Sequence, residues 1–240
     1  MNRRPRTLKV VRLHLANRAT YIWVPLAVVG ATFLISLAMW GVILLGFRGE
    51  PLPSSGGFGG LQLIPSYYCV TLGIQAMMYT YPFAMAMSLT RREYINGTML
   101  LATLFATCLA TLYAVGRAIE DLTNGYGVWL RFFHLSEWIG HTTWWEQWLF
   151  LAGLNLMLLM AGFSGTTVFR RGGALRLVVV LTCWMFGVVG ASALVTLCEW
   201  WPAVGTWMMQ QTPGTGGFIM LVIAAGFAVG SYWSMRKTVP

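Results

Sequence analysis

Charged residues are scarce in this chain, and acidic residues are the scarcest. Only 7 Asp and Glu accompany 16 Lys and Arg among 240 residues, so that 10% of the chain is charged and 57% is hydrophobic. An ordinary soluble domain has about 25% charged residues, and this composition therefore predicts a polytopic membrane protein. The net charge of +9 does not indicate nucleic-acid binding, because the basic residues lie at the ends of apolar segments and do not cluster on one soluble face.

Motifs that carry chemistry are also missing. The sequence contains no G-x-x-x-x-G-K-[ST] loop for ATP phosphates. Its four cysteines fall in or at the ends of apolar segments without C-x-x-C spacing, which favours small core residues over a metal or redox pair. His134, Glu137 and His141 would share one face of a helix, but without the H-E-x-x-H context they are interpreted as the solvated face of an external helix. We therefore predict no metal, cofactor or enzymatic activity for the chain itself.

What the sequence does have is six apolar stretches long enough to cross a bilayer, which takes roughly 20 helical residues. They cover residues 19–47, 65–89, 97–116, 147–169, 177–198 and 217–235. Residues 1–18 are predicted to lie at the cytoplasmic surface, and residues 117–145 are predicted to form an external cap of short helices. Pro82 is expected to bend the second span, because proline removes a backbone donor. The prediction is an all-α protein with a single transmembrane domain over residues 1–240.

Three charges, Arg91, Arg92 and Glu93, separate two charge-free runs and predict a tight hairpin at one membrane face. Arg at a helix centre costs about 2.5 to 3.5 kcal/mol on insertion scales, and paired basic residues in a short loop favour the cytoplasmic side. Both termini then lie inside, together with thirteen of the sixteen basic residues. These are Arg3, Arg4, Arg6, Lys9, Arg12, Arg18, Arg91, Arg92, Arg170, Arg171, Arg176, Arg236 and Lys237. Most tryptophans fall at or beyond the outer ends, where their rings favour the headgroup level.

Uncharged polar residues mark the second and fifth predicted spans. Thr71, Gln75 and Tyr79 recur every four residues and form one stripe of the second span, and Thr182 and Ser192 lie in the fifth. Two interpretations of these residues remain open: a helix-packing seam with interhelical hydrogen bonds of about 0.6 kcal/mol each, or a face that lines a substrate path. No predicted span has an ionisable residue through its centre, which argues against an autonomous proton or ion pathway.

Three short segments resemble the permeases of bacterial ABC-type exporters of the type-2 class. Residues 88–98, SLTRREYINGT, are similar to the end of a span in that class, with a Thr/Ser-Arg-Arg, aromatic, Gly-Thr pattern. Residues 118–133, AIEDLTNGYGVWLRFF, resemble the external segment of one small six-span branch, and residues 165–173, GTTVFRRGG, resemble its basic turn after the fourth span. Together with the six predicted spans, the resemblance covers essentially the whole chain.

The resemblance implies a permease subunit in the bacterial plasma membrane with an N-terminal interfacial helix and six spans. It also implies a coupling helix between the second and third spans, in or beside which Arg91, Arg92, Glu93 and Tyr94 would lie. ATP and Mg would be bound by a separate ATP-binding cassette subunit, and a second permease copy, identical or related, would complete the exporter. The central cavity of the family, between the second and fifth spans, adds weight to Gln75 and Thr182.

The expected function is therefore export of an amphipathic or apolar substrate, such as a drug, peptide or lipid. The alternative is a membrane scaffold or sensor subunit that transports nothing, and a membrane enzyme would have to use the group around His134. The connector of residues 199–216 carries an apolar aromatic run that could re-enter the membrane, as short helices do in the family.

Overall fold

The computed structural model describes residues 10–11, 13–14, 17–46, 61–135 and 142–236, and most of these residues are helical. Within them no β-strand occurs. Four helical stretches are long and apolar enough to cross a membrane: Ala19–Gly46, Arg91–Thr123, Trp144–Leu197 and Pro213–Met235. The prediction of an all-α fold is confirmed for the described residues, and four apolar helices of this length suggest a multi-pass membrane protein.

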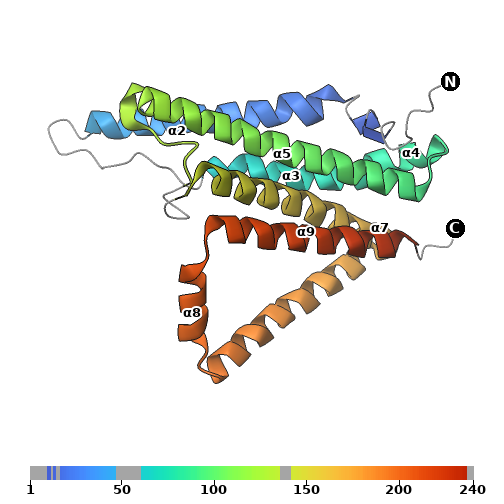
Figure 1. Ribbon diagram of the computed structural model, residues 1–240. Coiled ribbons are helices and arrows are strands. Elements are labelled where there is room, and N and C mark those ends of the chain that lie inside the picture. Colours follow the sequence, from blue (N-terminus) through green and yellow to red (C-terminus); the bar gives the residue numbers. More distant parts are fainter. Residues whose placement is uncertain (1–9, 12, 15–16, 47–60, 136–141, 237–240) are drawn as a thin grey trace.

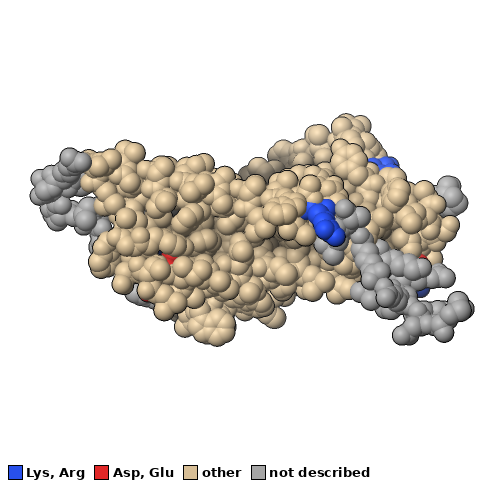
Figure 2. All heavy atoms as spheres, turned by 90° about the horizontal axis from the view of Figure 1, so that it is seen from above, with Lys and Arg blue, Asp and Glu red and all other residues tan. Residues whose placement is uncertain are grey.

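Long helices run side by side and form most of the molecule (Figure 1). In chain order the elements are η1 (Ala19–Trp23), α2 (Val24–Gly46), η2 (Leu61–Leu63), α3 (Ile64–Gln75), η3 (Ala76–Thr80), α4 (Tyr81–Ala86), α5 (Arg91–Thr123), η4 (Gly125–Trp129), α7 (Trp144–Leu197), α8 (Trp201–Gln210) and α9 (Pro213–Arg236). The start of the described chain and the end of α9 lie at the same end of the bundle. On the face shown in Figure 2, the basic atoms all lie in the half towards that end.

The hairpin before α5 is tighter than the sequence suggested. Thr90 and Glu93 form a capping box, in which the Thr90 hydroxyl accepts from the Glu93 N–H at 3.3 Å and the Glu93 carboxylate accepts from the Thr90 N–H at 3.0 Å. Helix α5 therefore begins at Arg91, not near residue 97, and continues to Thr123. Only residues 87–90 separate α4 from α5. The separate coupling helix that the resemblance implies at this place is absent among these residues.

The predicted bend at Pro82 takes the form of a π-turn, η3, which lies just before it. In η3 the N–H of Tyr81 bonds to the carbonyl of Ala76, five residues earlier. The carbonyl of Met77 is left without a helical partner, because Tyr81 is already engaged and Pro82 has no N–H. Helices α3, η3 and α4 nevertheless follow one another without a gap.

The basic turn predicted between residues 169 and 177 coincides with a sharp break inside α7. Gly172 (φ −144°, ψ 16°) and Gly173 (φ +67°, ψ −167°) leave helical geometry there, and the positive φ of Gly173 favours glycine. The half of α7 that precedes the break packs in the bundle, and the half that follows it runs outwards to α8, which leads back to α9 (Figure 1). Residues 199–216 thus contain a short helix, α8, and the start of α9.

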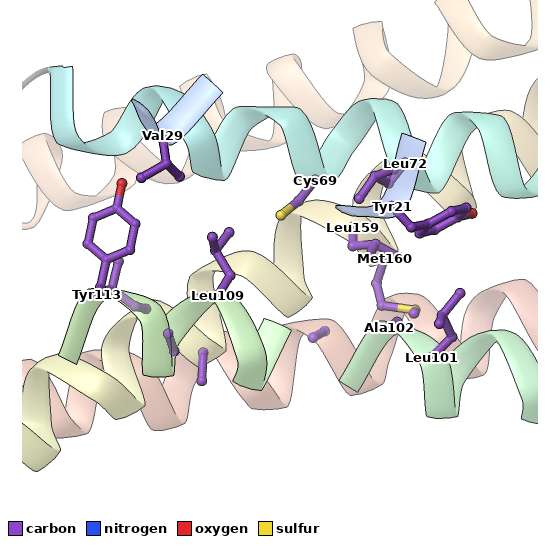
Figure 3. Packing of buried hydrophobic residues seen from close by; sticks show 14 of the residues in the cluster. Tyr21, Val29, Cys69, Leu72, Leu101, Ala102, Leu109, Tyr113, Leu159 and Met160 are labelled. Carbon is purple, nitrogen blue, oxygen red and sulfur yellow. The ribbon is translucent and has the colours of Figure 1, made fainter. Parts of the chain in front are cut away.

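Close backbone contacts hold α3 against the first half of α7. A Cβ on Gly73 would lie 2.1 Å from the carbonyl oxygen of Leu159, and a Cβ on Gly162 would lie 2.2 Å from that of Val70. Small residues at such crossings let two membrane helices approach closely, and the close approach is stabilised by the additional dispersion contacts. Around this crossing the buried side chains of α2, α3, α5 and α7 meet in one cluster (Figure 3).

One sequence prediction needs correction here, and another lies largely outside the described residues. Of the cysteines, Cys69 is buried as expected, but Cys108, Cys183 and Cys198 are exposed on the chain's outer surface. Much of the predicted cytoplasmic segment 1–18 lies outside the described residues. Of its described part, Val10 and His14 are helical and buried, and Val10 packs with side chains of η3, α4 and α5.

Candidate functional site

The polar stripe of the second predicted span faces outwards. Thr71 is exposed, Gln75 is partly exposed, and Tyr79 has 76% of its surface exposed, whereas Cys69 and Leu72 on the same helix are buried. The structure shows no hydrogen bond for the Gln75 amide within the described residues. The stripe is therefore not a seam inside this chain, and its polar groups are available to a partner or to a water-filled path.

The second half of α7 stands apart from the bundle. Thr182 and Ser192 are exposed there, and so are large apolar side chains all around the helix. The Ser192 hydroxyl donates to the Val189 carbonyl of the same helix at 2.8 Å, so its hydrogen-bond donor is already paired within the helix. A shallow groove of about 290 Å³ along this helix is lined by Val178, Leu181, Thr182, Met185, Phe186 and Val189.

A larger cavity lies in the angle between the two halves of α7 and helix α9. It measures about 520 Å³, which is within the usual size range of ligand pockets. Its walls are apolar with small hydroxyl side chains, among them Ser164, Thr167 and Ser231. The Thr167 hydroxyl bonds to the Phe163 carbonyl, while that of Ser231 is buried without a partner among the described residues. Neither Thr71, Gln75 nor Tyr79 lines this cavity, so the two predicted halves of the substrate path do not meet within one chain.

The four predicted coupling residues have different roles in the hairpin. Glu93 caps α5, and Arg91 donates from Nη1 to the Met235 carbonyl at the end of α9, at 3.2 Å. Arg92 is exposed. Tyr94 is fully buried: its hydroxyl donates to the Ala76 carbonyl, and its ring packs edge-on against Tyr81. A partner could touch Arg92 directly, whereas Tyr94 can act only by fixing the hairpin on η3.

Arg170 is a residue that sequence reasoning did not single out at this end of the bundle. Its Nη1 atom donates to the Met77 carbonyl at 2.9 Å, and its guanidinium lies 5.4 Å from the centre of the Tyr81 ring. It thereby supplies the donor that Pro82 lacks. The only sequence signal was the proline itself, which guarantees a carbonyl in need of a partner.

At the opposite end, the described residues between α5 and residue 135 contain one short helical turn, η4, where the sequence predicts a cap of short helices. After α5, left-handed φ angles at Asn124 and Gly125 turn the chain back on itself, and residues 130–135 run without helix onto α5. We call residues 124–135 the cap loop. The cap loop is anchored by Glu120, a buried carboxylate that accepts from the N–H groups of Phe132 and Phe133 at 2.8 to 3.0 Å.

His134 belongs to this anchor and not to a solvated helix face. It is buried, with Nδ1 3.1 Å from a Glu120 oxygen and Nε2 3.1 Å from an Asp121 oxygen. Glu137 and His141, which with His134 formed the possible metal-ligand set in the sequence, lie outside the described residues. Because the two carboxylates stand on opposite edges of the imidazole, they do not converge on one point with it, and the described residues contain no cluster that could hold a metal ion.

A second polar network joins the cap loop to the start of α7. Arg117 donates to the Gln147 amide oxygen at 2.8 Å and to the Thr142 carbonyl at 2.9 Å. The Gln147 amide nitrogen donates in turn to the Phe133 carbonyl at 2.6 Å. These bonds explain how Arg117 and Gln147 are held among apolar helices, because buried polar groups must be paired.

Comparison of the chain with protein families, curated proteins and solved structures finds no match. The functional argument therefore rests on the residues themselves and on the resemblance of the three short segments described above.

Proposed function

We propose that this chain is the permease subunit of an ATP-driven exporter in a bacterial plasma membrane, with six membrane crossings and both termini in the cytoplasm. The second crossing consists of α3, η3 and α4, and the break at Gly172 and Gly173 divides α7 into the fourth and fifth. ATP hydrolysis takes place on a separate ATP-binding subunit. The substrate passes between two permease copies and is amphipathic or apolar, such as a drug, peptide or lipid.

The observation that carries this proposal is the fifth crossing, the half of α7 after Gly173. A helix that spans a bilayer alone gains little from its neighbours in the same chain, and here it leaves a cavity of about 520 Å³ beside α9. A second copy supplies the missing wall. The outward stripe of Thr71, Gln75 and Tyr79 also lacks a partner in its own chain, and two copies can place such a stripe opposite a fifth crossing.

The hairpin before α5 supports a cytoplasmic partner. Arg92 is exposed on a turn that is rigid, because Glu93 caps the helix, Arg91 is tied to α9 and Tyr94 is buried. A rigid, basic protrusion suits an acidic groove on an ATPase, through which a motion of the partner would be transmitted to η3 and α5.

The native Cys183 on the fifth crossing allows a direct test. If two copies meet there, mild oxidation of membranes that hold the protein should yield a disulfide-linked dimer, and Cys183→Ser should abolish it. Cys108→Ser serves as the matched control, because Cys108 is exposed on α5 and should not matter. The protein should also co-purify with an ATP-binding subunit. A chain that stays monomeric and purifies without a nucleotide-binding protein contradicts the proposal.

The second candidate function, a scaffold or sensor without transport, shares the exposed hairpin and fifth crossing. The few hydroxyl groups in the otherwise apolar wall of the cavity beside α9 favour transport over it, because a pure scaffold has no need of the buried Ser231 hydroxyl, which lacks a partner among the described residues. Substrate-stimulated ATP hydrolysis by the reconstituted complex separates the two, because a scaffold gives none.

A further inference from the structure

We propose that the groove between the start of α2 and the middle of α5 holds one acyl chain of an anionic phospholipid from the cytoplasmic leaflet. This groove, the α2–α5 groove, has a volume of about 410 Å³, which is within the usual range of ligand pockets. Ile22 and Leu26 lie on one side of it, and α5 from Leu101 to Leu112 forms the other. The proposal goes beyond transport and does not depend on it, since only the choice of leaflet uses the proposed orientation.

The groove is open because α2 packs mainly on α3 and has few direct contacts with α5. At the far end of the bundle the cap loop fills the space between the two helices, where Trp40 of α2 and Phe132 are buried in one cluster. Nearer the cytoplasmic end, the floor of the groove consists of the buried side chains of Tyr21, Leu101 and Leu109, which belong to the core cluster of Figure 3. An apolar gap that stays empty forfeits dispersion contacts on its open side, so within a bilayer hydrocarbon chains fill it.

The end of the groove nearest the N-terminus is shaped by the π-turn η1. In η1 the N–H of Val24 bonds to the carbonyl of Ala19, five residues earlier. The next carbonyl, that of Thr20, has no helical donor, because Val24 is already engaged and Pro25 has no N–H. The Tyr68 hydroxyl of α3 donates to it at 3.0 Å. Pro25 therefore lines the groove without leaving an unpaired backbone carbonyl there, as contact with hydrocarbon requires.

The length of the groove fits a single lipid chain. Its α5 wall, from Leu101 to Leu112, is about 17 Å long at the helical rise of about 1.5 Å per residue. One leaflet of a bilayer with a hydrocarbon core of about 30 Å is about 15 Å deep. The wall therefore matches the depth that one acyl chain covers.

The charge at the end of the groove selects the headgroup. Arg18 stands one helical turn before Ile22, is exposed, and makes no hydrogen bond or ion pair with another described residue. No acidic residue precedes Glu50 in the sequence, so this segment offers Arg18 no carboxylate. A guanidinium binds phosphate through paired, charge-assisted hydrogen bonds, and anionic lipids of the cytoplasmic leaflet attract basic residues. Arg18 therefore favours a lipid with a net negative charge over a zwitterionic one.

The native Cys108 lines the groove and is exposed, so its reaction with an uncharged maleimide reports whether the groove is occupied. The experiment uses the purified full-length protein in detergent with Cys183→Ser and Cys198→Ser, which leaves Cys108 as the exposed thiol because Cys69 is buried. Dioleoyl phosphatidylglycerol and dioleoyl phosphatidylcholine have the same chains and differ in headgroup charge. The phosphatidylglycerol concentration that halves the labelling rate should be about fivefold lower than that of phosphatidylcholine, which is the effect of one basic residue near an anionic surface.

Two arginine variants locate the headgroup. Arg18→Gln should bring the two halving concentrations together. Arg92→Gln removes an exposed arginine that lies at the same end of the bundle and does not line the groove, and it should keep the fivefold difference. Labelling of Cys183 in a protein with Cys108→Ser and Cys198→Ser controls for the general effect of a charged micelle on thiols, and it should show no preference between the lipids.

Three results would overturn the proposal. Equal halving concentrations before any arginine is changed would identify ordinary boundary lipid, and a fivefold difference that survives Arg18→Gln would exclude Arg18 as the headgroup site. A disulfide between two copies through Cys108 on mild oxidation would place a second chain in the groove. The measurement requires neither an ATP-binding subunit nor transport, so its failure is distinct from a failure of the proposed function.

Discussion

Arg170 donates a 2.9 Å hydrogen bond to the carbonyl oxygen of Met77, a carbonyl in the π-turn η3 that has no helical donor because the residue five positions on is Pro82. The bond joins the end of the first half of α7 to the middle of the second predicted span. It also lies beside Tyr94, which bonds to the neighbouring carbonyl of Ala76. The widened turn is thus held from two other helices, and its geometry depends on both.

Replacing Arg170 should therefore destabilise the protein. Arg170→Gln removes a charged donor, and such hydrogen bonds contribute about 1.5 to 3 kcal/mol; because Arg170 is largely exposed, we expect a loss near or below the lower end. Arg171→Gln is the control, since it removes the same charge from a residue with no hydrogen bond to other described residues. Thermal unfolding in detergent should show a lower midpoint for the first variant only. Equal midpoints would mean that water satisfies Met77 equally well.

The crossing of α3 and α7 gives a prediction with a larger effect. In Gly162→Ala the new methyl group would lie 2.2 Å from the Val70 carbonyl oxygen, so the helices must move apart. Overpacking of this kind costs about 1 to 3 kcal/mol. Gly165→Ala is one turn away and meets nothing within 4 Å, so it should be neutral or slightly stabilising, because alanine is the better helix former. If the two variants have the same unfolding midpoint, the close packing of α3 on α7 is contradicted.

The sequence predicted the fold class and most of the long helices, because charge-free runs and basic ends are direct physical consequences of a bilayer. The break in α7 was also foreshadowed, by two arginines followed by Gly172 and Gly173. The prediction from the sequence failed where local hydrogen bonds and turns decide the structure. The capping box of Thr90 and Glu93 starts α5 earlier than the apolar run, and a polar segment after Glu120 reads as short helices until its turn residues are considered.

The site was harder to predict than the fold. A stripe of Thr71, Gln75 and Tyr79 can be read from spacing, but the side of the helix it faces depends on which neighbours cover the other faces. Glu120 and His134 are 14 residues apart in the chain, and five residues with positive φ angles lie between them. A contact of this kind leaves no regular spacing in the sequence. The contact of Arg170 with Met77 leaves none either, so the sequence indicated only that Arg170 is a charge at the end of a span.

His14 should make the protein less stable in acid. Burial lowers the pKa of His14; its Nδ1 contacts the Val10 carbonyl, and its Nε2 has no partner among the described residues. A group whose folded pKa lies below its unfolded value adds stability that is fully present above the unfolded pKa and is lost as pH falls towards the folded one. His14→Gln should flatten this acid-side fall in the unfolding midpoint. An unchanged acid-side fall in His14→Gln would contradict the assignment.

Substitution of Arg92 is the most direct test of whether the hairpin before α5 docks on a partner. Because Arg91 is bonded to α9 and Glu93 caps α5, charge reversal at either would disturb the fold itself. Arg92→Glu changes only an exposed charge and should weaken assembly with the ATP-binding subunit or lower substrate-stimulated ATP hydrolysis. Arg18→Glu, an exposed reversal at the same end, should not. Normal coupling in Arg92→Glu would leave only an anchoring role for Arg92, provided that thiol labelling of Leu122→Cys shows normal insertion.

The outward stripe of the second span allows the two open interpretations to be separated. An unpaired amide in hydrocarbon costs several kcal/mol, so Gln75 must face protein or water in the assembled protein. If it faces a packed seam with a second copy, Gln75→Leu should alter the stability of the dimer and leave stimulation of ATP hydrolysis intact. If it faces a substrate path, the same change should alter stimulation or the substrate profile while the dimer stays folded.

Thr182→Val on the fifth crossing is the companion variant, because it removes a hydroxyl and nearly preserves the shape of the side chain. Both variants require thermal stability and substrate-stimulated hydrolysis to be measured on one preparation. We expect altered stimulation with little change in stability at both positions, since one hydrogen-bonding group would be lost from a wet surface without leaving a buried orphan. A destabilised dimer with normal stimulation at both positions would place Gln75 and Thr182 in a helix seam and remove them from the proposed path.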